Sequence, residues 1–387
     1  RYNARVNVNS NITDWFKANM NASLSNSVQD YSDYDGSSTS NVWYSAQFVS
    51  PLFPVYVKGL DGKNVLGEDG KPQLDYGENG RPGSYTDYNP VGGLTDDKSN
   101  KKNDVASLRT GVTFGSDKDN FGVFKGIKLN VNFGLDYRNQ SRMSYMNMYH
   151  GNQATAGGLL TKYNTRMQSY TFNQLLSWNR SFGLHSFDVL AGHEFYAYSY
   201  EYLKAGKTNL VDGILELRPG TTLYAADSYT DKYRIESWLG RFNYNYKSKY
   251  MAELNARYDG SSKFLPENRW NFFWGASAGW RISEESFMEG IHDYVSELKL
   301  RASYGEVGNQ SGIGRYDGIQ LYNYKSNSGA LLGTSKGTYV ESAGLVSKVR
   351  TWERIYNYNL GLDFGFIGNR LTGTFELFMN LNSATLL

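Results

Sequence analysis

Apolar and polar residues alternate along much of this 387-residue chain with a period of two. In the segment IKLNVNFGLDYR, residues 127–138, apolar side chains such as Val131 and Phe133 share one face, and polar ones such as Asn130 and Asn132 share the other. A period of two is that of a β-strand, whereas an amphipathic helix repeats apolar residues every three or four positions. The segment is therefore predicted to be a strand with one apolar and one polar face.

The same alternation recurs in about twelve segments along the chain. They are residues 2–8, 16–24, 108–114, 127–137, 170–178, 187–197, 238–246, 250–258, 272–282, 298–304, 360–366 and 371–379. The pattern predicts an all-β protein without long helices.

The connections between these segments alternate in length. One set of connections is short. It comprises residues 10–13, 180–185, 247–249 and 368–369, with somewhat longer members at 116–126 and 283–296. These connections alternate with longer polar stretches at 26–104, 139–165, 204–232, 259–269 and 306–350. In an up-and-down antiparallel sheet, successive connections lie at opposite ends. The alternation in length therefore places the short connections at one end of the sheet and the long ones at the other. Outer-membrane barrels have this asymmetry, with short periplasmic turns and long extracellular loops.

Composition fits a β-barrel that spans a membrane. The 32 Tyr, 20 Phe and 8 Trp residues suit pleated surfaces, and the mean hydropathy is low at −0.56. Runs of ~18 apolar residues are absent, which excludes a transmembrane helix but not a barrel whose strands need only ~9–11 residues, apolar on one face. Because a barrel of twelve or more strands is too wide to fill with side chains, we expect the polar face to line a wet lumen and the apolar face to meet lipid.

Charge and residue usage exclude several other functions. The 40 basic and 38 acidic residues give a net charge of +2, so we expect no nucleic-acid partner. The chain has no Cys, and its four His residues include no pair spaced four apart, so neither a metal site nor a cofactor is expected. The stretch DYDG at 33–36 is too short for an EF-hand, and loop calcium stays an open question.

A G-x-S-x-G pattern surrounds Ser277, as in hydrolases that place a serine nucleophile on a sharp turn between a strand and a helix. Here the alternation runs through the serine without a break, so Ser277 is predicted to be a small luminal residue in mid-strand. We therefore expect no catalytic residues and no enzyme activity.

The stretch DGKNVLGEDGKPQLDYGENGRPGSYTDYNP, residues 61–90, is a candidate binding loop. Its Asp-Gly and Asn-Gly steps favour tight turns with positive φ, which predicts partial order. Five aromatic residues in or before it are candidates for contacting a sugar ring or a peptide, and equally for packing against the loop or a partner: Trp43, Tyr44, Tyr76, Tyr85 and Tyr88.

Several longer segments resemble a known family. Three segments are similar to the barrel of SusC/RagA-type TonB-dependent transporters of Bacteroidetes. They are residues 244–288, which contain R-x-D-G-S-S-x-F and N-R-W-x-x-F…S-A-G-W-R-I, residues 298–310, which contain R-x-S-Y-G-x-x-G-N-Q, and residues 358–378. The resemblance implies a 22-stranded antiparallel transmembrane β-barrel that holds an N-terminal plug. It also implies import of glycans or peptides through the outer membrane of a Gram-negative bacterium, with a SusD-like lipoprotein as lid and energy from TonB.

On this interpretation residues 1–387 are part of the barrel, with about 12 strands of the implied 22. The chain begins at Arg1 within a strand pattern, so the plug and the final strands are expected to lie outside it. Two alternatives share the strand pattern: a passive outer-membrane porin or adhesin-like barrel, and a secreted carbohydrate-active β protein.

Overall fold

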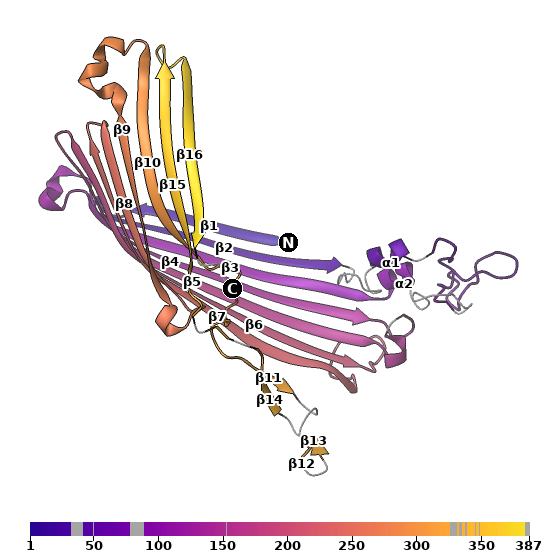
Figure 1. The fold of residues 1–387 in the computed structure, drawn as a ribbon. Coiled ribbons are helices and arrows are strands. Elements are labelled where there is room, and N and C mark those ends of the chain that lie inside the picture. Colours follow the sequence, from indigo (N-terminus) through magenta and orange to yellow (C-terminus); the bar gives the residue numbers. More distant parts are fainter. Residues whose placement is uncertain are drawn as a thin grey trace.

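The computed structural model describes residues 1–31, 42–48, 50–77, 89–151, 153–325, 331–332, 335–336, 339–344, 346–347 and 349–383. Within these residues twelve long strands form one curved antiparallel sheet, in which each strand pairs with the next one along the chain (Figure 1). The strands are β1 (Tyr2–Asn11), β2 (Phe16–Tyr31), β3 (Lys98–Gly115), β4 (Ile127–Met146), β5 (Leu159–Phe182), β6 (His185–Thr208), β7 (Thr222–Tyr246), β8 (Tyr250–Ser261), β9 (Trp270–Arg281), β10 (Val295–Asn309), β15 (Glu353–Phe366) and β16 (Leu371–Ser383).

Shorter elements lie in the connections. Two small sheets, formed by β11 (Tyr322–Lys325) with β14 (Tyr339–Ser342) and by β12 (Leu331–Leu332) with β13 (Ser335–Lys336), extend from the β10–β15 connection (Figure 1). The helices are α1 (Val42–Phe48) and α2 (Pro90–Thr95), and the 3-10 turns are η1 (Asp119–Phe124), η2 (Ala154–Ala156), η3 (Pro266–Asn268), η4 (Ile282–Glu284) and η5 (Ser286–Ile291). Among the described residues, no helix has the length and apolar character needed to cross a membrane.

The register places the predicted apolar faces of neighbouring strands together. Directly opposite residues point to the same side of an antiparallel sheet. Val131 on β4 is opposite Val112 on β3, and Phe172 on β5 is opposite Phe195 on β6. Across the other half of the sheet, Leu360 on β15 lies between Ala302 and Leu377. The twelve predicted alternating segments therefore form one continuous apolar face, although Ile282 begins η4 and does not belong to β9.

The apolar face has a defined height. On β6 its residues run from Phe187 to Ala197, and the next positions on the same side are Ser199 and Glu201. Across β2 to β6 a polar row marks the limit, made by Asn26, Asp104, Asn139, Arg166 and Glu201, each directly opposite the next. A band of about ten residues per strand is the length that a tilted strand needs to cross the hydrocarbon core of a bilayer.

The strands continue well beyond this band at the end that carries the long connections. β5 and β6 each contain 24 residues and β7 contains 25. A strand of 24 residues is about 80 Å long, roughly twice what a tilted strand needs to cross the hydrocarbon core. The middle strands therefore form a wall that projects past the apolar band.

The predicted boundaries of the long connections were wrong for this reason. Residues 139–165 and 204–232 were expected to be loops, but β4 continues to Met146, β5 begins at Leu159, β6 continues to Thr208 and β7 begins at Thr222. Beyond the band the outward face becomes polar, as at Ser199 and Glu201, so the apolar pattern that marked the strands ends while the backbone ladder continues.

At the opposite end, neighbouring connections are tied together through Glu285. Its carboxylate accepts hydrogen bonds from Lys249 Nζ at 2.6 Å, from the Tyr250 hydroxyl at 2.6 Å and from Trp280 Nε1 at 2.9 Å. These hydrogen bonds, from Lys249 first and Tyr250 second, lower the pKa of Glu285 from 4.5 to about 2. The carboxylate therefore joins the β7–β8 turn to the β9–β10 connection.

Arginine placed on the apolar face should destabilise the protein more than arginine on the opposite face. Leu360 lies on the apolar face of β15, whereas its neighbour Asn359 lines a cavity on the other face. A charged side chain near the bilayer midplane costs about 2–4 kcal/mol. We expect Leu360→Arg to lower the unfolding free energy in lipid vesicles by that amount, and Asn359→Arg to lower it much less. Equal losses would contradict the assignment of faces.

Loss of the Glu285 carboxylate should destabilise the protein in a pH-dependent manner. Because the pKa of Glu285 is about 2 in the folded protein and 4.5 ordinarily, its contribution is complete above pH 4.5 and is lost as the pH falls towards 2. The melting temperature of Glu285→Gln should therefore be below that of the wild type at neutral pH, and the gap should close across this window. Glu289→Gln, at an exposed site in η5, serves as the control and should show no such gap.

Candidate functional site

The structure describes some of the aromatic residues predicted to contact a ligand. Trp43 lies on α1 and is 68% exposed. Tyr44 also lies on α1, and its side chain is outside the described atoms, while Tyr85 and Tyr88 are outside the described residues. Tyr76 is placed in a defined contact, which makes it the best starting point for a site.

Tyr76 packs against His150, which comes from the β4–β5 connection. The two rings are 3.7 Å apart with an angle of 18° between their planes, and the Tyr76 hydroxyl lies 2.8 Å from His150 Nε2. Gly92 of α2 lies directly beneath, where a Cβ atom would come 1.7 Å from the hydroxyl. The close approach of α2 to Tyr76 therefore requires glycine at position 92.

A polar network continues from His150 into the end of the β2–β3 connection. His150 Nε2 lies 2.5 Å from an Asp96 carboxylate oxygen. The backbone and side-chain nitrogens of Asn147 donate to Asp97 Oδ1 at 2.9 and 2.8 Å. Burial raises the pKa of Asp97, and the two bonds from Asn147 oppose that shift. This network fixes the β2–β3 connection against the β4–β5 connection.

The segment before Tyr76 folds around two similar turns. Asp61 Oδ1 accepts from the Lys63 amide and Asp69 Oδ1 accepts from the Lys71 amide, each at 3.0 Å. Gly62 and Gly70 have φ values of 75° and 74°, so the predicted Asp-Gly turns with positive φ are confirmed at these two steps. These turns give the candidate loop an ordered framework.

A cavity of about 910 Å³ opens between these turns and the β4–β5 connection. Its lining includes three aromatic side chains and several hydrogen-bonding groups: Tyr56, Tyr76, Tyr149, Asp69, Lys71 and Gln73. Aromatic faces combined with a few polar groups are typical of sites for small ligands. The cavity is the setting in which Tyr76 would meet a ligand.

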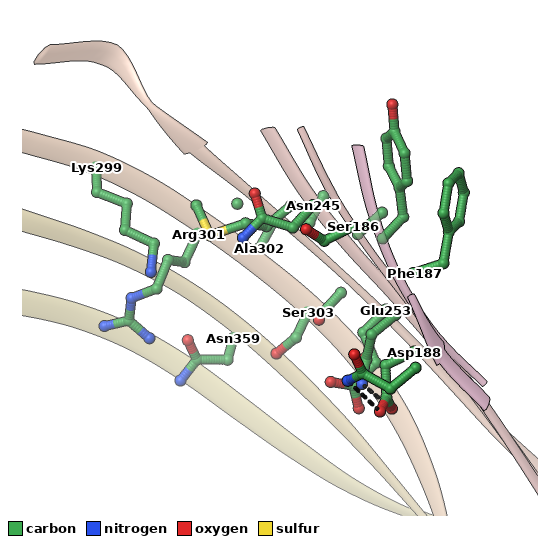
Figure 2. A pocket seen from close by; sticks show the side chains of 18 residues that line it. Ser186, Phe187, Asp188, Asn245, Glu253, Lys299, Arg301, Ala302, Ser303 and Asn359 are labelled. Atoms are coloured by element: carbon green, nitrogen blue, oxygen red, sulfur yellow. Dashed lines mark hydrogen bonds between the residues drawn. The ribbon is translucent and has the colours of Figure 1, made fainter. Parts of the chain in front are cut away.

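A second cavity, of about 560 Å³, lies on the polar face of the sheet (Figure 2). Figure 2 shows Lys299 and Arg301 on one side of it and the carboxylates of Asp188 and Glu253 on the other. Arg301 makes a bidentate contact with Asp363 at 2.8 and 2.9 Å and a third contact with Glu376 at 2.9 Å. The surface is polar and charged, as expected for a lumen wall.

Ser277 also lines this second cavity, in the middle of β9. It is opposite Glu253 on β8 and Ser303 on β10, and the strand continues on both sides of it. The predicted mid-strand position is therefore confirmed. A nucleophile elbow would need the strand to end at the serine.

The motifs that carried the family resemblance converge in space. Phe264, Phe273, Ile313 and Trp352 form a buried cluster, and Trp352 Nε1 donates to the Arg269 carbonyl at 2.9 Å. A Cβ atom on Gly308 would lie 2.3 Å from the Phe273 ring, and Ser261 Oγ lies 2.7 Å from Gln310 Oε1. This cluster could not be predicted from the motifs, because nothing in their spacing indicates which of their residues would meet.

The part of the chain that the structure describes contains no group of three His, Asp or Glu side chains arranged to hold a metal ion. The DYDG stretch considered for calcium lies outside the described residues.

Comparisons with known proteins agree with this architecture. Residues 53–381 match the family model described as TonB dependent receptor-like, beta-barrel. The TonB-dependent receptor SusC of Bacteroides thetaiotaomicron is 27% identical over 96% of this chain and 36% of SusC. The TonB-dependent receptor P3 of Formosa agariphila is 26% identical over 98% of this chain and 36% of that receptor. The chain thus spans 36% of the length of each of these two relatives.

Solved structures match the fold over almost the whole chain. The structure of the RagAB peptide transporter has a TM-score of 0.74 at 19% identity, over 98% of this chain and 40% of that one. The RagAB peptide importer in its 'closed-closed' state gives a TM-score of 0.75 at 20% identity, over the same shares. Since the family model spans most of the sheet, the chain belongs to the TonB-dependent receptor-like β-barrel family and is part of a transmembrane barrel of the bacterial outer membrane.

Proposed function

We propose that the chain forms part of the wall and external loops of a TonB-dependent importer of oligomeric nutrients, glycan or peptide. The observation that carries the proposal is the match over nearly the whole chain to SusC in sequence and to the RagAB transporter in fold. The continuous apolar band and the polar opposite face support a water-filled passage through the outer membrane.

In this mechanism the described residues bind and guide cargo without covalent chemistry. The cavity beside Tyr76 lies in the long connections, where cargo would first be captured, and the network around His150 and Asp97 keeps its walls in place. The polar cavity around Asp188 and Arg301 lies on the face that would line the passage. Capture at the loops would thus precede movement along the lumen.

Two partners follow from the family resemblance. A SusD-like surface lipoprotein would close over the long loops, and TonB would act on a plug inside the barrel. On this proposal the plug lies outside residues 1–387, and the described residues contribute wall strands and connections. The wall strands would then serve as the frame against which the plug rearranges.

Deletion of the gene for the full-length receptor should abolish growth on at least one oligomeric nutrient. The measurement is growth of the deletion strain on a panel of oligosaccharides and peptides, each as sole carbon or nitrogen source. Complementation with the intact gene should restore growth. Unchanged growth and uptake on every member of the panel would refute the import function.

Replacement of Ser277 by alanine should leave uptake unchanged. The hydroxyl faces a polar cavity in mid-strand, and transport requires no nucleophile there. Uptake by Ser277→Ala cells is compared with the wild type at equal receptor abundance, with Ser303→Ala as the matched control on the neighbouring strand. A severe loss in the correctly folded Ser277 variant alone would indicate a chemical role for the serine.

A further inference from the structure

Seven tyrosines lie together on one face of three adjacent strands. Four of them occupy alternate positions on β6, two lie on β7 and one lies on β5; this tyrosine array consists of Tyr196, Tyr198, Tyr200, Tyr202, Tyr229, Tyr233 and Tyr163. The register places Tyr198 opposite Tyr233 and Tyr202 opposite Tyr229, and Tyr163 lies opposite Lys204 on the same face. The array is therefore one surface built from sequence-distant strands.

The array faces the lumen. Tyr198 is opposite Ser169 on β5, and Ser169 is opposite Asp136 on β4, so all three belong to the polar face. The alternate positions on β6, such as Phe195 and Ala197, belong to the apolar face. The tyrosines consequently point to the side away from lipid.

Most of the array lies above the apolar band. On the outward side of β6 the positions between Tyr198 and Tyr202 are Ser199 and Glu201, and Glu201 forms an ion pair with Arg166 at 2.5 Å. This part of the wall therefore has water on its outside. Its aromatic surface is on the inside, where cargo would pass.

The rings form a nearly continuous surface. Ring centroids are 4.9 Å apart for Tyr202 and Tyr229, 5.9 Å for Tyr200 and Tyr229, and 6.4 Å for Tyr163 and Tyr202. Tyr229 is 48% exposed, and Tyr200 and Tyr202 are half-buried. Such spacing leaves ring faces and hydroxyl groups available on the same surface.

Charged side chains flank the array: two ion pairs lie beside it, and Lys204, which is opposite Asp227, has its Nζ 5.4 Å from the centre of the Tyr163 ring. Asp136 pairs with Arg109, and Asp231 pairs with Arg315 at 2.8 Å. The Arg315 guanidinium lies 4.6 Å from the centre of the Tyr198 ring, so one end of the array is covered by the β10–β11 connection. The remaining surface, around Tyr200, Tyr202 and Tyr229, presents aromatic and hydroxyl groups.

We propose that the tyrosine array is a binding track for an uncharged oligosaccharide inside the upper wall. A sugar ring has an apolar C–H face that stacks on an aromatic ring and a rim of hydroxyls that pairs with phenol oxygens. Tyrosine supplies both contacts at a low cost in conformational entropy. A peptide with charged termini would fit less well at Tyr200, Tyr202 and Tyr229, because the ring faces and phenol hydroxyls there carry no charge. This inference rests on the proposed import function and narrows its cargo to glycans.

The test uses the full-length receptor purified in detergent, with calorimetric titration of neutral hexasaccharides: maltohexaose, cellohexaose, mannohexaose and xylohexaose. A mixture of pentapeptides serves as the competing class of cargo. We expect at least one hexasaccharide to bind, and Tyr200→Ala and Tyr202→Ala each to weaken that binding about tenfold, the effect of losing one stacked ring. Tyr202→Phe keeps the ring and should retain most of the affinity.

The matched control is Ser199→Ala, which lies between the two tyrosines in sequence but faces outward, and it should bind like the wild type. Melting temperatures verify that each variant is folded. The proposal that the tyrosine array binds an oligosaccharide is refuted if the wild type binds no hexasaccharide, or if both alanine variants bind as tightly as the wild type. Peptide binding that the alanine variants weaken overturns the assignment to glycans. These outcomes are read on purified receptor, so they are separate from a failure of import, which appears in the growth of the deletion strain.

Discussion

The structure depends on hydrogen bonds between the backbone groups of neighbouring strands in the hydrocarbon core, because lipid tails offer no hydrogen-bond partners. In hydrocarbon, each unpaired amide or carbonyl group costs several kcal/mol, so strands that cross it must remain in an unbroken ladder. In the described ladders the register shifts at Gly206/Lys207, beyond the apolar band, and at Val295/Glu297, at the edge of the band, and both shifts lie near strand ends. The pairing is therefore regular across the interior of the band.

That constraint also explains which parts of the fold could be predicted from the sequence. Alternation reports the contrast between lipid on one side and water on the other, so it located all twelve strands where they cross the band. It does not report a strand that has water on both sides, so residues 222–232 of β7 and 139–146 of β4 were predicted to be loops. The alternation of apolar and polar residues therefore indicates which part of a strand crosses the membrane, but not where the strand begins and ends.

The candidate site was predictable in kind but not in its contacts. An excess of tyrosine in a long polar stretch singled out Tyr76, and Asp-Gly steps predicted the turns that precede it. Its partner His150 is 74 positions away, in a connection that showed no distinguishing motif. The buried cluster of Phe264, Phe273, Ile313 and Trp352 in the same way brings together the β8–β9 connection, strand β9 and two distant parts of the β10–β15 connection. Contacts of this kind depend on the order and stagger of the strands, and local composition does not contain that information.

The height of the wall has a mechanical consequence. Loops that begin at the bilayer surface would have to become ordered by their own contacts alone. The loops above β4 to β7 instead begin from a rigid, hydrogen-bonded wall. Under the proposed import function, much of the entropy that a capture surface must give up would already be lost when the barrel folds, before cargo arrives. The raised wall would also hold cargo away from the lipid headgroups, so that recognition and crossing would take place at separate levels of one continuous sheet.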